Sequence, residues 1–259
     1  MRKFDGYIFA IYKRTKIHTL VLWTKHPGSL LIDPLNQYLR KLKKERIQLY
    51  IQLTITGMGQ ITVGEKPGGS PLVLEPKAPT SDEALNALPE IIKLVEKPER
   101  IRLRVDPIVR INDHKGNKFS SLKFFPYILR SASDLGIKTF SFSFLEEGIH
   151  KKVDNRMAKL GCTIDSPSNP EREKMLHWIE DLEKKLQVGI HPCCVPNMPI
   201  SKCIDGEELM HLHDDHAPVS LKQPRKRKLC GCTESIDIGG WPPKKCYTGC
   251  LYCYANVNL

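Results

Sequence analysis

Through residue 195, short runs of apolar and mostly β-branched residues alternate with longer stretches in which apolar residues recur every three or four positions. The short runs predict buried β-strands, and the longer stretches predict amphipathic helices. Regular alternation of the two is typical of parallel βαβ units. Strands are predicted over residues 18–23, 48–54, 101–105, 139–144 and 188–193, and helices over 30–44, from 81 onward, and over 120–135, 170–186 and 206–213.

Several predicted helices carry recognisable signals at their ends. Ser81 is followed by two acidic residues, so its hydroxyl is expected to cap a helix start. Pro170 opens a later helix, and Gly136 is the expected end of the one before it. These signals fix the helix boundaries more firmly than periodicity alone.

The predicted order of elements fits two α/β architectures, a partial or permuted (β/α) barrel and an open doubly wound sheet. We predict the barrel-like form for residues 1–195. From residue 196 the chain is rich in Pro, Gly, His, Cys and basic residues, so residues 196–259 cannot bury a core of their own. We expect this cysteine-rich, cluster-binding segment to pack on the barrel, over the end of the sheet where the strand-to-helix loops converge.

The composition is that of an ordinary globular protein, with 41% apolar and 27% charged residues among 259. No stretch reaches the roughly 18 consecutive apolar residues of a membrane span. Arg2, Lys3 and Asp5 stand where a signal peptide would begin its apolar run. We therefore expect a cytoplasmic protein that does not bind membranes.

The formal net charge of +11 favours contact with nucleic acid, an acidic partner or an anionic small molecule. Two basic runs contribute to it, residues 40–46 and 222–228. The first is expected to be the solvated end of a helix, where cations suit the helix dipole. The second is either a basic linker or a segment that contacts phosphates, and the sequence leaves both interpretations open.

Eight of the nine cysteines lie after position 190, which in a reducing compartment indicates metal binding more than a disulfide framework. Cys246, Cys250 and Cys253 are separated by three and two residues in a loop with one glycine. Such a loop can direct three thiolates at three irons of one 4Fe-4S cluster and leave the fourth iron for an exogenous ligand. Zinc, the alternative, prefers four ligands, most often in pairs.

A second metal is expected on the cysteines that precede this loop. Cys203, Cys230 and Cys232, with Cys194 or its neighbour Cys193, could supply four thiolates to a second iron-sulfur cluster or to zinc. We take Cys194 as the fourth ligand. The other interpretation is that Cys193 and Cys203 are buried as small hydrophobic residues.

Three histidines and one further cysteine are assigned no metal. His211, His213 and His216 are close in sequence, but the first two point to different faces of a short helix. We expect all three on a solvated surface, and Cys162 in the core.

Polar residues follow two neighbouring predicted strands. Thr54 and Thr56 end the second strand, and Arg104 and Asp106 end the third. Arg104 and Asp106 alternate with apolar residues, so both are expected to project to the same side. They could form a salt-bridged pair that fixes the strand end, or bind an anion. Glu75, in a proline-bounded loop, could add a carboxylate.

Cys246, Cys250 and Cys253, with the aromatic Tyr252 before the last cysteine, resemble the cluster-binding signature of the radical S-adenosylmethionine (SAM) superfamily. Further motifs occur in one order along the chain, at residues 23–27 (WTKHP), 52–57 (QLTITG), 74–76 (LEP), 104–107 (RVDP), 202–205 (KCID) and 230–239 (CGCTESIDIG). Together with residues 246–256, these motifs resemble the family of domain of unknown function 1848 over nearly the whole chain.

The resemblance implies a barrel related to radical SAM proteins, with spore photoproduct lyase as a distant analogue. In that superfamily SAM binds the fourth iron and is cleaved to a 5′-deoxyadenosyl radical, which abstracts hydrogen from a substrate. By the same resemblance, the backbone of Tyr252 would lie by the adenine of SAM. We expect Thr54, Thr56, Arg104 and Asp106 to line the pocket.

Two functions are therefore predicted. The first is a radical SAM enzyme with a 4Fe-4S cluster and SAM, acting on an unknown small-molecule or nucleic-acid substrate. The second is a non-catalytic, metal-bearing protein that binds nucleic acid, which the positive charge favours. A partner subunit could complete the barrel.

Overall fold

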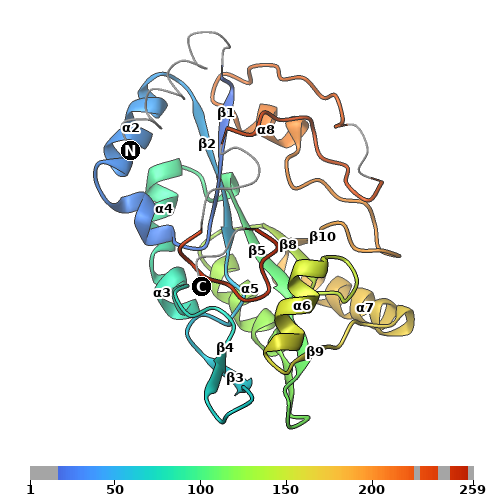
Figure 1. The fold of residues 1–259 in the computed structure, drawn as a ribbon. Helices are drawn as coiled ribbons and strands as arrows, with labels where there is room; N and C mark the ends of the chain where they lie inside the picture. The colour runs from blue at the N-terminus through green and yellow to red at the C-terminus, as the bar shows by residue number, and fades with distance from the viewer. Residues whose placement is uncertain (1–16, 225–227, 239–245, 256–259) are drawn as a thin grey trace.

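The computed structural model describes residues 17–224, 228–238 and 246–255 (Figure 1). At its centre five parallel strands pair in the order β1-β2-β5-β8-β10, so neighbours in the sheet also follow one another along the chain. The five-strand parallel sheet of an α/β fold, predicted from the sequence, is confirmed. The strands are β1 (Thr19–Thr24), β2 (Gln48–Thr54), β5 (Ile101–Ile108), β8 (Thr139–Phe144) and β10 (Gly189–Pro192).

Helices occupy each connection between these strands. They are η1 (Pro27–Leu31), α2 (Leu35–Lys44), α3 (Ser81–Asn86), α4 (Leu88–Val95), η2 (Pro98–Arg100), η3 (Ser121–Phe124), α5 (Phe125–Ser133), α6 (Lys151–Lys159) and α7 (Asn169–Leu186), followed after β10 by α8 (Gly206–Leu212), the η elements being 3-10 helices. The helix predicted over 30–44 is divided into η1 and α2, because Pro34 disfavours helical backbone at the residue before it. The prediction that Ser81 caps α3 was wrong by one residue, since Thr80 Oγ1 accepts the Glu83 N–H at 3.2 Å.

Five short strands and one helix were not predicted. β3 (Thr62–Glu65) and β4 (Pro71–Val73) form a hairpin in the Gly- and Pro-rich stretch after β2. β6 (Arg110–Asn112) pairs with both β7 (Lys118–Ser120) and β9 (Thr163–Ile164). These strands have four residues or fewer, which is too short for a repeating pattern to identify them. The missed helix, α6, is mostly polar.

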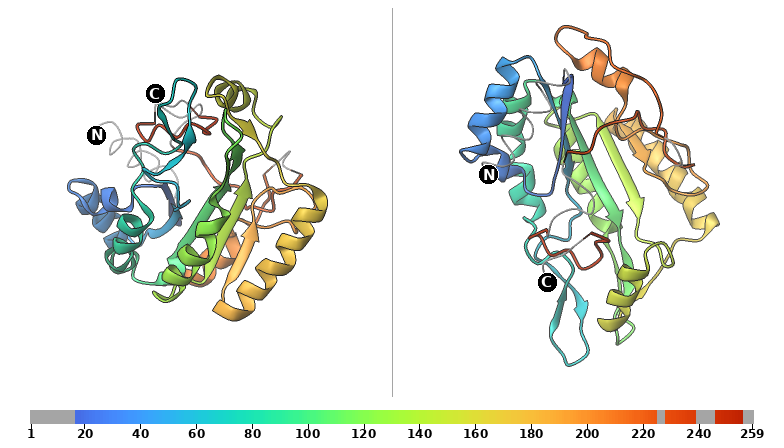
Figure 2. Two further views of the ribbon diagram at one scale, coloured as in Figure 1. Left: turned by 90° about the horizontal axis from the view of Figure 1, so that it is seen from below. Right: turned by 45° about the horizontal axis from the view of Figure 1, so that its top comes forward.

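One face of the sheet is apolar and carries the main core. Side chains alternate between the two faces of a strand, and Leu49, Ile51 and Leu53 of β2 point to this face. α2, α4, α5 and α7 cover it (Figures 1 and 2). The helices bury Leu39, Leu42, Ile91, Leu94, Ile128, Leu129 and Ile179 against the strands.

The opposite face of the sheet is polar and nevertheless buried. It carries Gln48, Gln52, Arg102, Arg104 and Ser141, each of them at most 4% exposed. Residues 196–224 and 228–238, here called the cover segment, lie over this face together with their helix α8 (Figure 2, right). The cysteine-rich part of the chain therefore packs along a sheet face as well as at one end.

Backbone carbonyl groups of the cover segment accept hydrogen bonds from several donors of the polar face. Gln52 Nε2 donates to Cys203 O at 2.5 Å, and Gln48 Nε2 donates to Leu209 O at 3.0 Å. Arg102 donates to a further carbonyl group of the cover segment and forms an ion pair with Glu208 at 3.1 Å. Because buried polar groups need such partners, the sheet and the cover segment depend on each other.

Strand pairing within the described ranges leaves β1 and β10 as the two edges of the sheet. None of the helices in those ranges is both long enough and apolar enough to cross a membrane. The helices, the parallel sheet and the cover segment form three layers, in that order.

Truncating Phe142 tests the apolar core. Phe142 is fully buried in β8 and makes edge-to-face contacts with Phe125 and Phe144. Phe142→Ala is expected to lower the free energy of unfolding by about 3–5 kcal/mol, measured by denaturant titration, because it leaves a cavity. Ile149→Ala, at a position that is 62% exposed, should change it by less than about 0.5 kcal/mol. Similar losses for both variants would contradict the packing described.

Candidate functional site

Residues 246–255, here called the thiol loop, dock at the carboxyl ends of β1 and β2. The Leu251 N–H donates to Leu74 O at 2.9 Å, just beyond β4. From the other side, Arg156 of α6 donates to the carbonyl oxygens of Leu251 and Cys253, both at 2.8 Å. Figure 1 shows the loop, in dark red, beside β4 and α6. The loop is therefore held by the connections after β2 and β8.

A buried carboxylate joins the thiol loop to the strand ends. Glu75 is 2% exposed and accepts hydrogen bonds from Thr56 Oγ1 at 2.6 Å, Lys25 Nζ at 2.9 Å and the hydroxyl of Tyr252. Lys25 Nζ also donates to the Tyr252 hydroxyl at 3.0 Å. Lys25 follows β1 and Thr56 follows β2, so two strand ends and the loop meet in what we call the Glu75 network.

The Glu75 network keeps its carboxyl group ionised. Burial alone would raise the pKa of Glu75, but the charge of Lys25 and the hydrogen bonds from Thr56, Tyr252 and Lys25 outweigh it, so the pKa lies below its ordinary value. Burial, and then the charge of Glu75, raise the pKa of the Tyr252 phenol well above its ordinary value. At neutral pH Glu75 is therefore a hydrogen-bond acceptor and Tyr252 a donor.

Three thiols gather in the loop beside this network. Cys250 is buried, and Cys246 and Cys253 are half-buried. Burial raises the pKa of Cys250 to about 12; Lys25 opposes the rise, while Glu75, Cys253 and Cys246 add to it. The charges of Cys246 and Cys253 both act on Cys250, so each of these two thiols lies within electrostatic range of it. A cation among them would favour their thiolate forms.

A small cavity of about 10 Å³ lies beside the Glu75 network. Lys25, Thr54, Thr56 and Glu75 are among the residues that line it. This volume holds about one water molecule. The Thr56 hydroxyl is already bonded to Glu75, whereas Thr54 is half-buried at the cavity wall.

Arg104 and Asp106 project to the same side of β5, as predicted, and form an ion pair. Ser143 Oγ donates to the other oxygen of Asp106. The Arg104 guanidinium also lies over the Trp23 ring, 4.6 Å from its centroid, and donates to Cys203 Sγ at 3.2 Å. Protein partners therefore surround the guanidinium group.

A second gathering of thiols lies where β10 ends. We call it the strand-end cysteine group, and it consists of Cys193, Cys194, Cys203, Cys230 and Cys232. Cys193 Sγ is 3.0 Å from Cys203 Sγ, and the backbone N–H of Cys203 donates to Cys232 Sγ at 3.1 Å. The Cys230 thiol lies close enough to Cys232 and Cys194 to raise the pKa of each. The structure thus brings together the four cysteines predicted for a second metal, and adds Cys193.

Ionisation within this group is uneven. Hydrogen bonds from Cys193 and Cys232 outweigh burial and, with the charge of Arg104, hold the pKa of Cys203 well below its ordinary value. The hydrogen bond to Cys203 and burial raise the pKa values of Cys193 and Cys232. Of these three thiols, Cys203 is therefore the most acidic.

No three His, Cys, Asp or Glu side chains in the described ranges are placed to hold a single metal ion between them. Cys162 is buried in the core, as expected. Of the three histidines predicted on a solvated surface, His211 and His216 are exposed, but the prediction was wrong for His213. Its ring is buried against that of His18, with centroids 4.5 Å apart.

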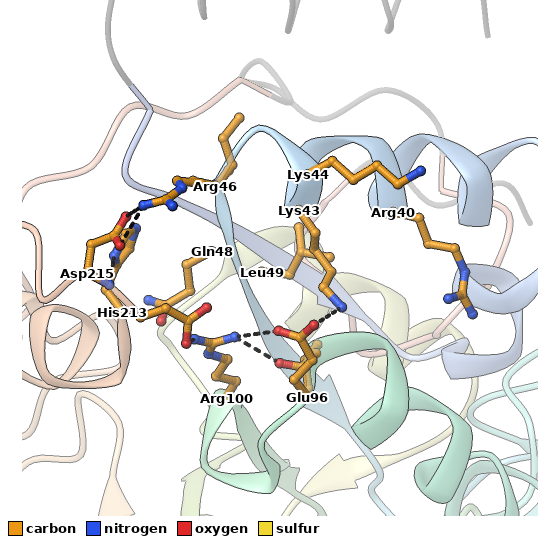
Figure 3. A pocket seen from close by; sticks show the side chains of 13 residues that line it. Arg40, Lys43, Lys44, Arg46, Gln48, Leu49, Glu96, Arg100, His213 and Asp215 are labelled. Carbon is orange, nitrogen blue, oxygen red and sulfur yellow. Dashed lines mark hydrogen bonds and ion pairs between the residues drawn. The ribbon is translucent and has the colours of Figure 1, made fainter.

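A basic pocket of about 650 Å³ opens at the amino end of the sheet, where β2 and β5 begin (Figure 3). Its charged residues are Arg40, Lys43, Lys44, Arg46, Arg100, Glu96, Asp214 and Asp215. The carboxylates pair with Lys43, Arg46 and Arg100. Arg40 bonds to the Asn36 side chain, and Lys44 forms no ion pair with a described residue. The run 40–46, expected to be only a solvated helix end, thus forms one wall of a pocket.

The model of the family described as Domain of unknown function (DUF1848) matches residues 8–255. The chain belongs to this family. No curated protein and no solved structure matches it. The family resemblance inferred from the motifs is confirmed, while the relation to radical SAM proteins stays a prediction.

Some contacts in this DUF1848 protein were missed from the sequence. His26 Nε2 bonds to Thr248 Oγ1 at 2.8 Å, and the His26 ring packs on Tyr247 with centroids 4.7 Å apart. Arg156, which holds the thiol loop, carried no signal at all. His26 stands in the WTKHP motif, so that motif was the signal that could have found it. Glu75, in the LEP motif, was named from the sequence as a possible carboxylate.

Glu75→Gln tests the Glu75 network, because it preserves the side-chain shape and removes the charge that faces Lys25. The free energy of unfolding is expected to fall by about 3 kcal/mol, as for a broken buried ion pair. Hydrogen exchange over residues 246–255 should accelerate. Glu173→Gln, which removes one exposed charge from α7, should change neither.

The difference between wild type and Glu75→Gln should also depend on pH. The pKa of Glu75 is lowered in the folded state, so its contribution is fully present above its ordinary value of 4.5 and is lost as the pH falls through the lower folded value. A difference that persists unchanged in acid would contradict an ionised Glu75.

Proposed function

We propose that this DUF1848 protein is a radical SAM-type enzyme that uses a 4Fe-4S cluster on Cys246, Cys250 and Cys253 to abstract hydrogen from a substrate. The observation that carries the proposal is the gathering of three thiols in one short loop at the carboxyl ends of β1 and β2. Ligands bind at this end in barrels and in open α/β sheets, because the strand-to-helix loops converge there.

The donor set of the thiol loop fits a cluster better than zinc. Structural zinc sites take four protein ligands, and no set of described side chains is arranged around one ion. Three cysteine ligands leave one iron of a 4Fe-4S cluster for another ligand. Once bound, the cluster would supply one electron to SAM, which divides into methionine and a 5′-deoxyadenosyl radical that takes a hydrogen atom from the substrate.

The Glu75 network has a positioning role in this proposal. Tyr252 stands between the last two loop cysteines, so anchoring its phenol on Glu75 and Lys25 fixes the backbone between them. That backbone is the segment we propose to lie by the adenine of SAM. Thr54, at the cavity wall, is the second residue we assign to the cofactor.

Three other residues that were predicted to line the pocket already bond to protein groups. The Thr56 hydroxyl bonds to Glu75, and Arg104 and Asp106 neutralise each other. These contacts favour positioning roles over direct contact with the SAM carboxylate. Arg104 lies in the middle of β5, pairs there with Asp106 and reaches the strand-end cysteine group.

In a partial (β/α) barrel the polar face of the sheet would be the interior, and its strand order is the one a barrel also has. The cover segment already lies over this face and bonds to it. Gln52 and Ser141 are buried there, and each keeps one oxygen without a hydrogen-bond partner in the described ranges. Such groups favour ordered water between the sheet and the cover segment.

Alanine at Cys246, Cys250 or Cys253 tests the proposal. Anaerobically reconstituted wild type, given SAM and a strong reductant, is expected to form 5′-deoxyadenosine, and its reduced 4Fe-4S EPR signal should shift when SAM is added. Each alanine variant should lose both properties, because three ligands hold the cluster. Cys162→Ala, at a buried cysteine outside both groups, should retain them. Wild type that keeps a cluster but forms no 5′-deoxyadenosine would overturn the proposal.

The basic pocket favours binding of nucleic acid as a second function. Lysine and arginine side chains contact the phosphate backbone of nucleic acids, and Arg40 and Lys44 extend the basic wall beyond the paired cations. Residues 225–227 of the other basic run lie outside the described residues. The pocket is at the opposite end of the sheet from the thiol loop, so this binding would not require a metal.

The double variant Arg40→Ala/Lys44→Ala tests this second function. Affinity for a duplex oligonucleotide should fall, and the slope of log K against log salt should become shallower by about 1.8, since each phosphate contact contributes about 0.9. Lys184→Ala/Lys185→Ala removes the same charge from α7 and should leave the slope unchanged. Absence of binding by wild type at low salt would remove this function.

A further inference from the structure

The strand-end cysteine group is assembled from three separate stretches of chain. Cys193 and Cys194 follow β10, Cys203 precedes α8, and Cys230 and Cys232 lie at the far end of the cover segment. Cys193 Sγ lies 3.0 Å from Cys203 Sγ, and the backbone N–H of Cys203 donates to Cys232 Sγ at 3.1 Å. The Cys230 thiol lies close enough to Cys232 and Cys194 to raise the pKa of each. The fold therefore brings thiol groups from three stretches of the chain into one region.

The surroundings of these sulfurs are polar. Arg104 donates to Cys203 Sγ at 3.2 Å, and the backbone N–H groups of Cys203 and Ile204 donate to Cys232 Sγ at 3.1 and 3.5 Å. Cysteines that serve only as small hydrophobic residues have no need of such donors. Hydrogen bonds from backbone and side chains to cysteine sulfur are a feature of iron-sulfur sites, where they tune the bound cluster.

We propose that the strand-end cysteine group is a second metal centre, an iron-sulfur cluster ligated by Cys193, Cys203, Cys230 and Cys232. It stands on residues other than those of the thiol loop and does not depend on the function proposed for that loop. Four thiolates complete the cysteine ligation of such a cluster, so this centre has no open iron and serves electron transfer or structure. Each thiol releases its proton when it binds iron.

The contacts select Cys193 over Cys194 as the fourth ligand. Cys193 Sγ lies against Cys203 Sγ and is half-buried, whereas Cys194 is exposed. This changes the assignment made from the sequence, in which Cys194 was the fourth ligand. The centre would link the cover segment to the end of β10, because three of its ligands lie in the cover segment and Cys193 directly follows β10.

Zinc is the less suitable metal. A tetrahedral zinc ion needs its ligands gathered around one point. No three side chains in the described ranges are placed to hold one ion.

The test uses the full chain with Cys246, Cys250 and Cys253 all changed to alanine, purified without oxygen. If the second centre exists, this variant should retain about four iron and four sulfide per chain and a 4Fe-4S EPR signal that SAM does not alter. Adding Cys203→Ala or Cys193→Ala should bring the iron content to near zero, whereas adding Cys194→Ala should leave it unchanged. Circular dichroism checks that each variant is folded.

The outcomes separate this inference from the proposed function. Iron that survives loss of the three loop cysteines but disappears with Cys203→Ala supports the second centre, even if SAM is never cleaved. Iron that disappears with the loop cysteines, while wild type cleaves SAM, supports only the thiol loop and overturns the second centre. One zinc per chain and no iron in the triple variant also overturns it. Should that variant not fold, native mass spectrometry of wild type should show the mass of two clusters, and one cluster would overturn the inference.

Discussion

The polar face of the parallel sheet has to be buried, and the rest of the molecule is arranged around that requirement. Side chains alternate along a strand, so the strands that place Leu49, Ile51 and Leu53 in the core also place Gln48 and Gln52 on the other side. A buried polar group without a partner costs about 1–3 kcal/mol. The apolar side chains of packed helices could not form hydrogen bonds with such a face. Backbone carbonyl groups of the cover segment accept hydrogen bonds from it.

The cover segment does not satisfy this face completely. Gln48 Oε1, Gln52 Oε1, Arg102 Nε and Ser141 Oγ are buried and have no hydrogen-bond partner in the described part of the chain. They stand on three adjacent strands, with Gln52 beside Arg102 in the register. The polar face therefore has hydrogen-bonding capacity that the described residues do not use.

The two cysteine groups are attached to the sheet by the same kind of interaction. A cation of the sheet is neutralised by a carboxylate and reaches a neighbouring cysteine-bearing segment. Lys25, just after β1, pairs with Glu75 and bonds to Tyr252. Arg104, within β5, pairs with Asp106 and bonds to Cys203. Such charges are stable in a buried site because each is paired and hydrogen-bonded. The basic pocket at the amino end lies apart from both groups.

The sequence by itself determined the five parallel strands, because each is a short apolar run whose pattern reflects local burial. It also determined the family, through its motifs, and the closeness of Cys246, Cys250 and Cys253, through their spacing. It could not identify strands as short as β9, or separate Thr80 from Ser81 as a cap, because both residues suit that position. Only the tertiary structure decided which distant side chains meet: Glu75 with Tyr252, Arg104 with Cys203, and Cys193 instead of Cys194 at the sulfur contact. Those pairings depend on how the cover segment and the thiol loop fold back on the sheet, and contacts of that range leave no periodic signal in the chain.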